Sequence, residues 1–242
     1  MTGGFSVINR RSLKAGARRA MTGRQPSSWL VSLAYFAIIF VLAILSLRVC
    51  FPGLSLKNIL RIYLELDENP EAFLHSYSTS SVSWLLGVAL SIMTGMIGVG
   101  FRAYCLKVSR CEKAGFGELF DAFGVFFKVL WLQILISVFT YLWSLLFVIP
   151  GIVASYRYSL AVYFLLDNPD MTALECISAS KQATQGHKGQ LFVLDLSFIG
   201  WQILCAVPFV NLFVSVYYGV THASYYNVLS GYRPAPDGYG AC

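Results

Sequence analysis

Charged residues are scarce in this sequence. Only 12% of its 242 residues are Asp, Glu, Lys or Arg, whereas 57% are hydrophobic. Soluble domains carry about a quarter charged and about half apolar residues. The composition therefore excludes an ordinary soluble domain and is typical of an integral membrane protein.

Acidic residues are missing from the whole N-terminal stretch 1–28, which is strongly basic. Its cations are Arg10, Arg11, Lys14, Arg18, Arg19 and Arg24, as many as the formal net charge of +6. Directly before an apolar run, such a tail is attracted to anionic lipid headgroups by about 1 kcal/mol per basic residue. We predict a cytoplasmic tail in contact with headgroups and no nucleic-acid partner; the alternative is a tail that serves only as a topology signal.

Catalytic and metal-binding motifs are also missing. The sequence has no HExxH, GxSxG or Walker loop, and its histidines, His75, His187 and His222, stand far apart. Its six cysteines include no C-x-x-C pair. We therefore predict no enzyme, no catalytic residues, no metal site and no cofactor.

Long apolar runs are abundant. A membrane-spanning helix needs about 20 mostly apolar residues. The sequence predicts an all-α, polytopic transmembrane bundle of six spans, near 29–49, 82–106, 125–149, 152–168, 190–207 and 211–230. Pro150-Gly151 is expected to turn the chain between the third and fourth spans. The membrane domain then covers 29–230, between the basic tail 1–28 and a flexible, Gly/Pro-rich tail 231–242.

Lysines and arginines near the span ends predict the orientation, because they favour the cytoplasmic side. They cluster in the N-terminal tail, in the second connection at Lys107, Arg110 and Lys113, and in the fourth at Lys181 and Lys188. We expect a multi-pass membrane protein with both termini in the cytoplasm.

Three connections have the 3.6-residue periodicity of amphipathic helices. Their patterns are Leu56, Ile59, Leu60, Tyr63 and Leu64; Phe116, Leu119, Phe120, Phe123 and Phe127; and a capping box of Thr172 and Glu175 before Leu174 and Ile177, with Gly186 as the stop. These segments are predicted to lie in the headgroup plane.

Polar side chains within the spans are candidate functional residues. At 1.5 Å per residue, Arg157 lies roughly 8–9 Å below the outer boundary, and Ser144, Gln202 and Tyr218 lie at roughly 8–11 Å. These four are predicted to form one polar layer. Asp195, Gln133 and His222 fall at a similar depth from the inner boundary and are predicted to form a second.

The polar residues have two explanations. Gln133, Ser137, Thr140 and Ser144 follow i, i+4, i+7 and i+11 along the third span and indicate a polar stripe. Such a stripe lines a hydrated path or pocket, or it supplies interhelical hydrogen bonds of about 0.6 kcal/mol each. We favour the second explanation. Gly87, Ser91 and Gly95 give the second span a small-residue face, which leaves open a homo-oligomer.

Several stretches resemble a known family. They are "RRSLKAGARRAMTG", "GELFDAFGVFFKVL", the long segment from "LWSLLFVIPGIVASYRYSLAVYFLL" to "GQLFVLDLSFIGWQIL", and "THASYYNVL". Over nearly the whole chain the sequence resembles the bacterial integral membrane family named domain of unknown function 975. That family is distantly similar to the membrane domains of some glycerophosphodiester phosphodiesterases. The resemblance implies a fold and a membrane location, with no established activity.

Three functions remain as hypotheses. The first is a non-catalytic membrane protein that acts in lipid, envelope or partner-protein processes, which we favour. The second is a small transporter or channel that uses the polar layer around Arg157. The third is a lipid-modifying enzyme, which requires a nucleophile and a base to be adjacent.

Overall fold

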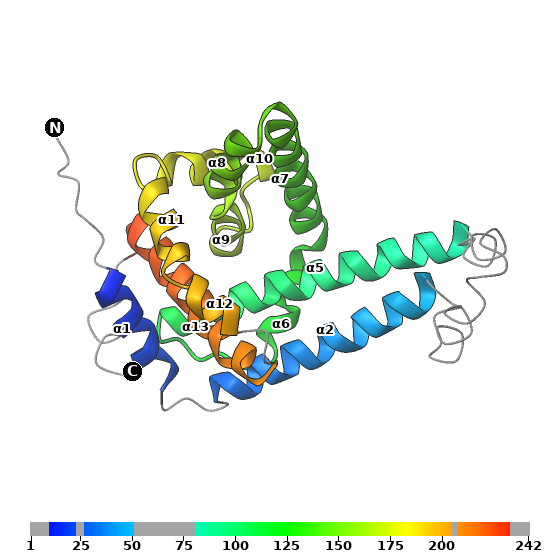
Figure 1. The fold of residues 1–242 in the computed structure, drawn as a ribbon, viewed down its shortest axis with the longest axis horizontal. Coiled ribbons are helices and arrows are strands. Elements are labelled where there is room, and N and C mark those ends of the chain that lie inside the picture. The colour runs from blue at the N-terminus through cyan, green and yellow to red at the C-terminus, as the bar shows by residue number, and fades with distance from the viewer. Residues whose placement is uncertain (1–9, 23–26, 51–80, 205–207, 233–242) are drawn as a thin grey trace, which may run out of the picture.

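The computed structural model describes residues 10–22, 27–50, 81–204 and 208–232, and within them every regular element is a helix (Figure 1). The predicted all-α class is confirmed for this part of the chain. The elements are α1 (Arg10–Met21), α2 (Ser28–Cys50), α5 (Ser81–Ser109), α6 (Glu118–Asp121), the 3₁₀ helix η1 (Ala122–Val125), α7 (Phe126–Leu146), α8 (Val148–Tyr158), α9 (Ala161–Asp167), α10 (Ala173–Ala183), α11 (Lys188–Leu196), α12 (Ile199–Leu204) and α13 (Pro208–Leu229).

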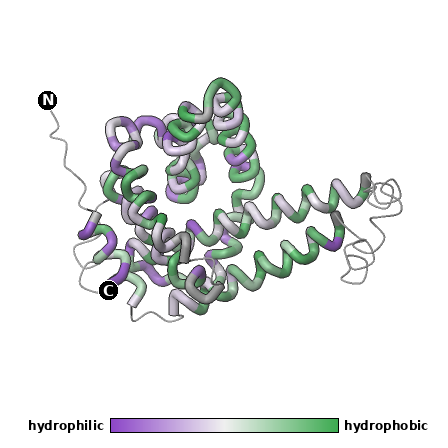
Figure 2. The backbone as a smooth tube through the Cα atoms, in the orientation of Figure 1, coloured by the Kyte–Doolittle hydropathy of each residue, from purple (hydrophilic) through white to green (hydrophobic). Residues whose placement is uncertain are grey.

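Four helical stretches are long and apolar enough to cross a membrane: Ser28–Val49, Val82–Ser109, Glu118–Leu146 and Ile149–Asp167. They coincide with the first four predicted spans. Large apolar side chains on them face outward, such as Phe40 at 66% and Trp84 at 65% exposure, and Figure 2 shows both long helices as mainly hydrophobic. A soluble monomer rarely exposes so much contiguous apolar surface, so these helices indicate a membrane protein.

The count of six spans is not confirmed. Where the fifth span was predicted, α11 ends at Leu196 and α12 begins at Ile199, so the helix is interrupted at Ser197 and Phe198. The predicted sixth span corresponds to α13, which has 22 residues but is not among the four candidates.

The break between the third and fourth spans lies three residues earlier than Pro150. α7 ends at Leu146, and Phe147 is extended, with φ −160° and ψ 152°. Pro150 and Gly151 then lie in the first turn of α8, where proline is tolerated because the first backbone N–H groups have no helical acceptor. Gly151 packs so closely that a Cβ on it would lie 2.2 Å from Ser144 Oγ.

The expected short helices have different outcomes. The Thr172–Glu175 capping box is present at the start of α10. The helix ends at Ala183, three residues before the predicted stop Gly186, which has a φ of 82° in the turn that follows. The Phe116–Phe127 pattern forms α6 and η1, with Leu119 buried and Phe120 exposed. The helix predicted around Leu56–Leu64 and most of the predicted C-terminal tail lie outside the described residues.

Helix α5 holds the centre of the packing. It lies alongside α2, where Tyr35 stacks on Phe101 at 4.3 Å between ring centroids, and it also contacts α13 and α6. Figure 1 shows α5, α7, α8, α11 and α13 arranged around a central region that also contains α9. These helices carry the candidate site.

Candidate functional site

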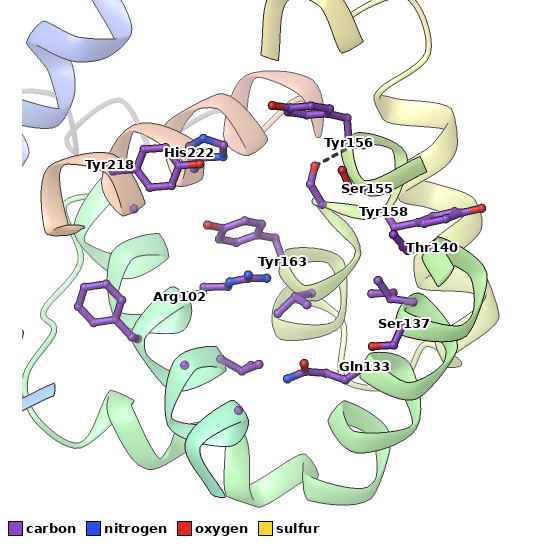
Figure 3. A pocket seen from close by; sticks show the side chains of 18 of the residues that line it. Arg102, Gln133, Ser137, Thr140, Ser155, Tyr156, Tyr158, Tyr163, Tyr218 and His222 are labelled. Carbon is purple, nitrogen blue, oxygen red and sulfur yellow. Dashed lines mark hydrogen bonds between the residues drawn. The ribbon is translucent and has the colours of Figure 1, made fainter. Parts of the chain in front are cut away.

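A cavity of about 980 Å³ lies between these helices, and residues from α2, α5, α7, α8, α9, α11 and α13 line it. That volume is at the upper end of the range for small-molecule sites. Polar and charged side chains point toward it from several directions, as Figure 3 shows for Arg102, Gln133, Tyr163, Tyr218 and His222. A polar cavity among apolar helices is a candidate binding site.

Helix α7 supplies one wall. Gln133, Ser137, Thr140 and Ser144 all line the cavity, so the predicted stripe lies on a single face of α7 and turns inward. The spacing explains this, because residues four and seven apart return to the same side of a helix. Thr140 Oγ1 is buried without a hydrogen-bond partner among the described residues. An unpaired buried hydroxyl of this kind is suited to a ligand or a water.

A cluster of Asp195, Tyr218 and His222 forms the opposite wall. Asp195 comes from α11, whereas Tyr218 and His222 are four residues apart on α13 and therefore share a face. Asp195 Oδ1 lies 2.6 Å from His222 Nε2 and accepts a hydrogen bond from the Tyr218 hydroxyl at 3.1 Å. The two rings lie 4.3 Å apart. His222 and Tyr218 therefore both help to compensate the charge of this partly buried carboxylate.

Arg102 of α5 brings a positive charge to the same cavity. Its side chain is exposed to this space and makes no hydrogen bond or ion pair with the described residues. Figure 3 shows it near Tyr163, and its charge also acts on Tyr35. Arg102 is not among the candidate residues of the sequence analysis, although it interrupts the predicted span 82–106 near its end. The available signal was its position seven residues before the end of α5, well inside an apolar helix.

A smaller crevice of about 380 Å³ adjoins the cavity between α5 and α7. Gly95, Gln133 and Ser137 line both spaces, and the remaining crevice residues are Ser91, Ile92, Met96, Leu130, Ile134 and Val138. A Cβ on Gly95 would lie 3.6 Å from Gln133 Nε2, so the absence of a side chain at Gly95 leaves room at this boundary. The crevice has fewer polar groups than the cavity it joins, although the lining of both spaces is more apolar than polar.

The structure does not keep the two predicted polar layers apart, because residues of both line the same cavity. Ser144, Tyr218, Asp195, His222 and Gln133 line one common cavity. Arg157 is not among the residues that line it, although its neighbours Tyr156 and Tyr158 are. Tyr218 bonds Asp195, which had been assigned to the other layer. Gln202 lies in α12, but its side chain is outside the described part of the chain.

Arg157 lies on the side of α8 toward α10. Its carbonyl accepts a hydrogen bond from Ser180 at 2.7 Å, and its Nε is buried without a hydrogen-bond partner in the described residues. Consecutive helical residues differ by about 100° in direction, so Arg157 points away when Ser155 and Ser159 face the cavity. The structure does not bring Arg157 and Ser144 into one cluster.

The basic tail forms α1, which is packed against α13 through the buried residues Leu13, Ala17 and Ala20. Lys14 bonds the Ser197 carbonyl at 3.4 Å and lies 4.1 Å from the centre of the Phe198 ring, and Arg18 lies over Tyr217. Arg11, Arg18 and Arg19 are exposed. Arg24 and the side chain of Arg10 lie outside the described residues.

A second charged cluster, which sequence reasoning missed, joins α5, α9 and α13. Arg110 bonds both carboxylate oxygens of Asp167 at 2.7 and 2.6 Å and donates from Nε to Asn227 at 3.0 Å. Tyr226 donates to Asp167 at 2.7 Å. Burial acts to lower the pKa of Arg110, but Asp167 outweighs it and raises that pKa. Arg110 had been interpreted only as a topology signal, and nothing in the sequence spacing indicates its partner.

The described residues contain no group of three or more His, Cys, Asp or Glu side chains that could hold a metal ion. Within the same residues, Asp195 is the side chain that hydrogen-bonds His222, and no serine or cysteine does so. A nucleophile activated by His222 would need such a contact. The geometry offers binding groups, with no assembled hydrolytic triad among the described residues.

Comparison with known proteins gives one family match. Residues 145–232 match the family described as "Protein of unknown function (DUF975)". This stretch runs from the end of α7 through α13 and includes Asp195, Tyr218 and His222, whereas Arg102 lies outside it. No curated protein and no solved structure matches the chain. The match supports an uncharacterised family over about a third of the sequence and assigns no activity.

Proposed function

We propose that this chain is a multi-pass protein of the bacterial plasma membrane that binds a lipid in its central cavity and acts, without catalysing a reaction, in lipid or envelope processes. The observation that carries the proposal is that a space with many polar groups adjoins a space with few. A cavity of about 980 Å³, lined by several hydroxyl, amide and charged side chains, shares Gly95, Gln133 and Ser137 with a crevice of about 380 Å³ that has a larger apolar share.

This combination matches an amphipathic ligand. A polar headgroup gains hydrogen bonds from the hydroxyl, amide and charged groups of the cavity, and those groups are costly to leave unpaired. An acyl chain gains apolar contact in the crevice between α5 and α7, where Ile92, Leu130 and Ile134 lie. The sequence resemblance to membrane domains of glycerophosphodiester phosphodiesterases points in the same direction.

The proposed orientation places both termini in the cytoplasm. It is supported by the basic tail, by Lys107 in the last turn of α5, and by Arg110 and Lys113 just after that helix. We propose that the exposed face of α1, which carries Arg18 and Arg19, contacts anionic headgroups at that surface. No nucleic acid or protein partner is part of the proposal.

The test is identification of the lipid that remains with the protein. The chain is purified from native membrane in mild detergent, and bound lipids are counted by mass spectrometry. Gly95→Leu fills the boundary between cavity and crevice, so it is expected to lower lipid occupancy at least several-fold. Gly200→Leu is the matched control, because a Cβ at Gly200 meets nothing within 4 Å. Equal occupancy in both variants, with unchanged thermal unfolding, would contradict the proposal.

Transport of a small polar solute is the second candidate function. The polar face of α7 favours it, because Gln133 to Ser144 is a stretch of roughly 16 Å along the helix axis. Arg157 does not line the cavity, so the polar groups that would serve transport are those on the inward face of α7, opposite Asp195. Solute flux in lipid vesicles that is lost in Asp195→Asn, while the folded protein is retained, would favour transport over lipid binding.

A further inference from the structure

Asp195 and Arg102, two charged residues that line the cavity, differ in whether neighbouring side chains neutralise them. Asp195 is the only acidic residue among the described lining residues, and His222 and Tyr218 already bind it. Arg102 has no ion-pair or hydrogen-bond partner in the described part of the chain. An arginine within an apolar helix is costly and is usually paired or placed at a functional site. The cavity therefore has an uncompensated positive charge.

The neighbours of Arg102 are suited to an anion. Tyr163 from α9 lies beside it in Figure 3, and Tyr35 is held in place by stacking on Phe101. Gln133 lines the same cavity and lies next to Gly95 of α5, where a Cβ would be 3.6 Å from its Nε2. A guanidinium presents donors in a planar fork that matches phosphate or carboxylate oxygens, and tyrosine hydroxyls and an amide add further donors.

The position of Arg102 along α5 indicates which leaflet of the membrane would supply the anion. It lies seven residues before Ser109, the last residue of α5, which is roughly 10 Å along the helix axis. Lys107 and Arg110 place that end of α5 on the cytoplasmic side. The cytoplasmic leaflet carries anionic lipids. The crevice at Gly95 and Gln133 gives an acyl chain a place beside this headgroup position.

We propose that the ligand of this cavity is an anionic phospholipid of the cytoplasmic leaflet and that Arg102 binds its phosphate. This inference rests on the proposed function, since it names the class of lipid and the residue that selects it. Neutralisation by the ligand accounts for an arginine that faces a membrane cavity with no protein counter-ion among the described residues.

The experiment measures binding to purified protein in neutral detergent. The probes are fluorescent phosphatidylglycerol, fluorescent phosphatidylcholine and inorganic phosphate as a competitor. The wild-type chain is expected to bind phosphatidylglycerol at least about tenfold more tightly than phosphatidylcholine. Arg102→Gln should lose that preference while still binding phosphatidylcholine, and Arg102→Lys should recover part of it because the charge returns without the fork.

Arg48→Gln is the matched control, because Arg48 is an exposed arginine of α2 that does not line the cavity. Thermal unfolding of each variant separates loss of binding from loss of folding. Equal preference in Arg102→Gln and Arg48→Gln would overturn the role of Arg102 and leave lipid binding intact. Absence of binding for both lipids would overturn the proposed function itself. Displacement of lipid by phosphate at similar affinity would support the anion site and contradict the lipid as its source.

Discussion

The charge of Asp195 in the cavity is compensated by neighbouring side chains, among them His222 and Tyr218. Hydrogen bonds to a charged group contribute about 1.5–3 kcal/mol each, and here both His222 and Tyr218 contact the same oxygen. We predict that Asp195→Asn lowers the free energy of unfolding by about 1–3 kcal/mol, measured by thermal unfolding in detergent.

Two further variants test whether the loss of stability comes from the contact between Asp195 and His222 or from the removal of any carboxylate. Asp170→Asn removes an exposed carboxylate and is expected to leave the unfolding temperature unchanged. Combining Asp195→Asn with His222→Gln should cost less than the sum of the two single changes, because both remove the same contact. An additive result would mean that the two side chains do not act together.

Arg110 and Asp167 form a second charged pair, which joins α5 to the end of α9 and lies away from the cavity. The guanidinium binds both carboxylate oxygens, and the side chains are only 11% and 19% exposed. Breaking a buried pair from one side leaves an uncompensated charge, so Asp167→Asn should reduce stability by about 3 kcal/mol. Removing both charges in Arg110→Met/Asp167→Leu should reduce it less than the single change does. Lys113→Ala, at an exposed position, is the control. A double variant less stable than Asp167→Asn would contradict this explanation.

Among the helices, α5 and α6 meet at Gly100. A Cβ on this residue would lie 2.0 Å from the backbone oxygen of Leu119, and backbone cannot move aside as a flexible side chain can. We predict that Gly100→Ala disrupts the packing of α6 on α5 and costs at least about 3 kcal/mol. Gly124→Ala is the control, since its Cβ would meet nothing within 4 Å. Unchanged unfolding temperature in Gly100→Ala would show that the two helices do not approach this closely.

The start of α10 provides a pH-dependent prediction. The Glu175 carboxylate accepts a hydrogen bond from the Thr172 backbone N–H at 2.8 Å, and that bond lowers the pKa of Glu175. A lowered folded-state pKa means that the stabilisation is present above the ordinary value of 4.5 and is lost as the pH falls through the folded-state pKa. The stability difference between wild type and Glu175→Gln should therefore shrink in acid. Ser178→Ala, on the same helix, should show no such trend.

These elements differ in how much the sequence reveals about them. The α10 cap was predictable because Thr172 and Glu175 interact across three residues, a local pattern. The inward face of α7 was predictable for the same reason. The pairing of Arg110 with Asp167, 57 residues away, and the exposure of Arg102 to the cavity depend on how helices pack. Periodicity describes one helix at a time and does not determine which neighbour its polar face meets.

In the whole molecule, α13 has an orientation that bears on the number of spans. Near its start, the Leu212 carbonyl accepts a hydrogen bond from Ser32, close to the beginning of α2, at 2.7 Å. Near its end, Asn227 donates to Ser109, the last residue of α5, at 2.9 Å. α2 and α5 run antiparallel side by side, so these two contacts lie at the same end of the pair (Figure 1). An upright span would reach the opposite end.

The membrane side of the α12–α13 connection therefore decides between two topologies. Both contacts of α13 lie at the end of α2 and α5 that we propose to be cytoplasmic from the position of the basic residues. We predict that reporter fusions after Leu204 and after Gly231 are both cytoplasmic, whereas a fusion after Asp67 is on the opposite side. The fusion after Asp67 is the internal control, because its side is the same with four or six spans. An outer signal after Leu204 would contradict a transverse α13 and support the six-span arrangement, in which this helix of about 33 Å crosses the bilayer.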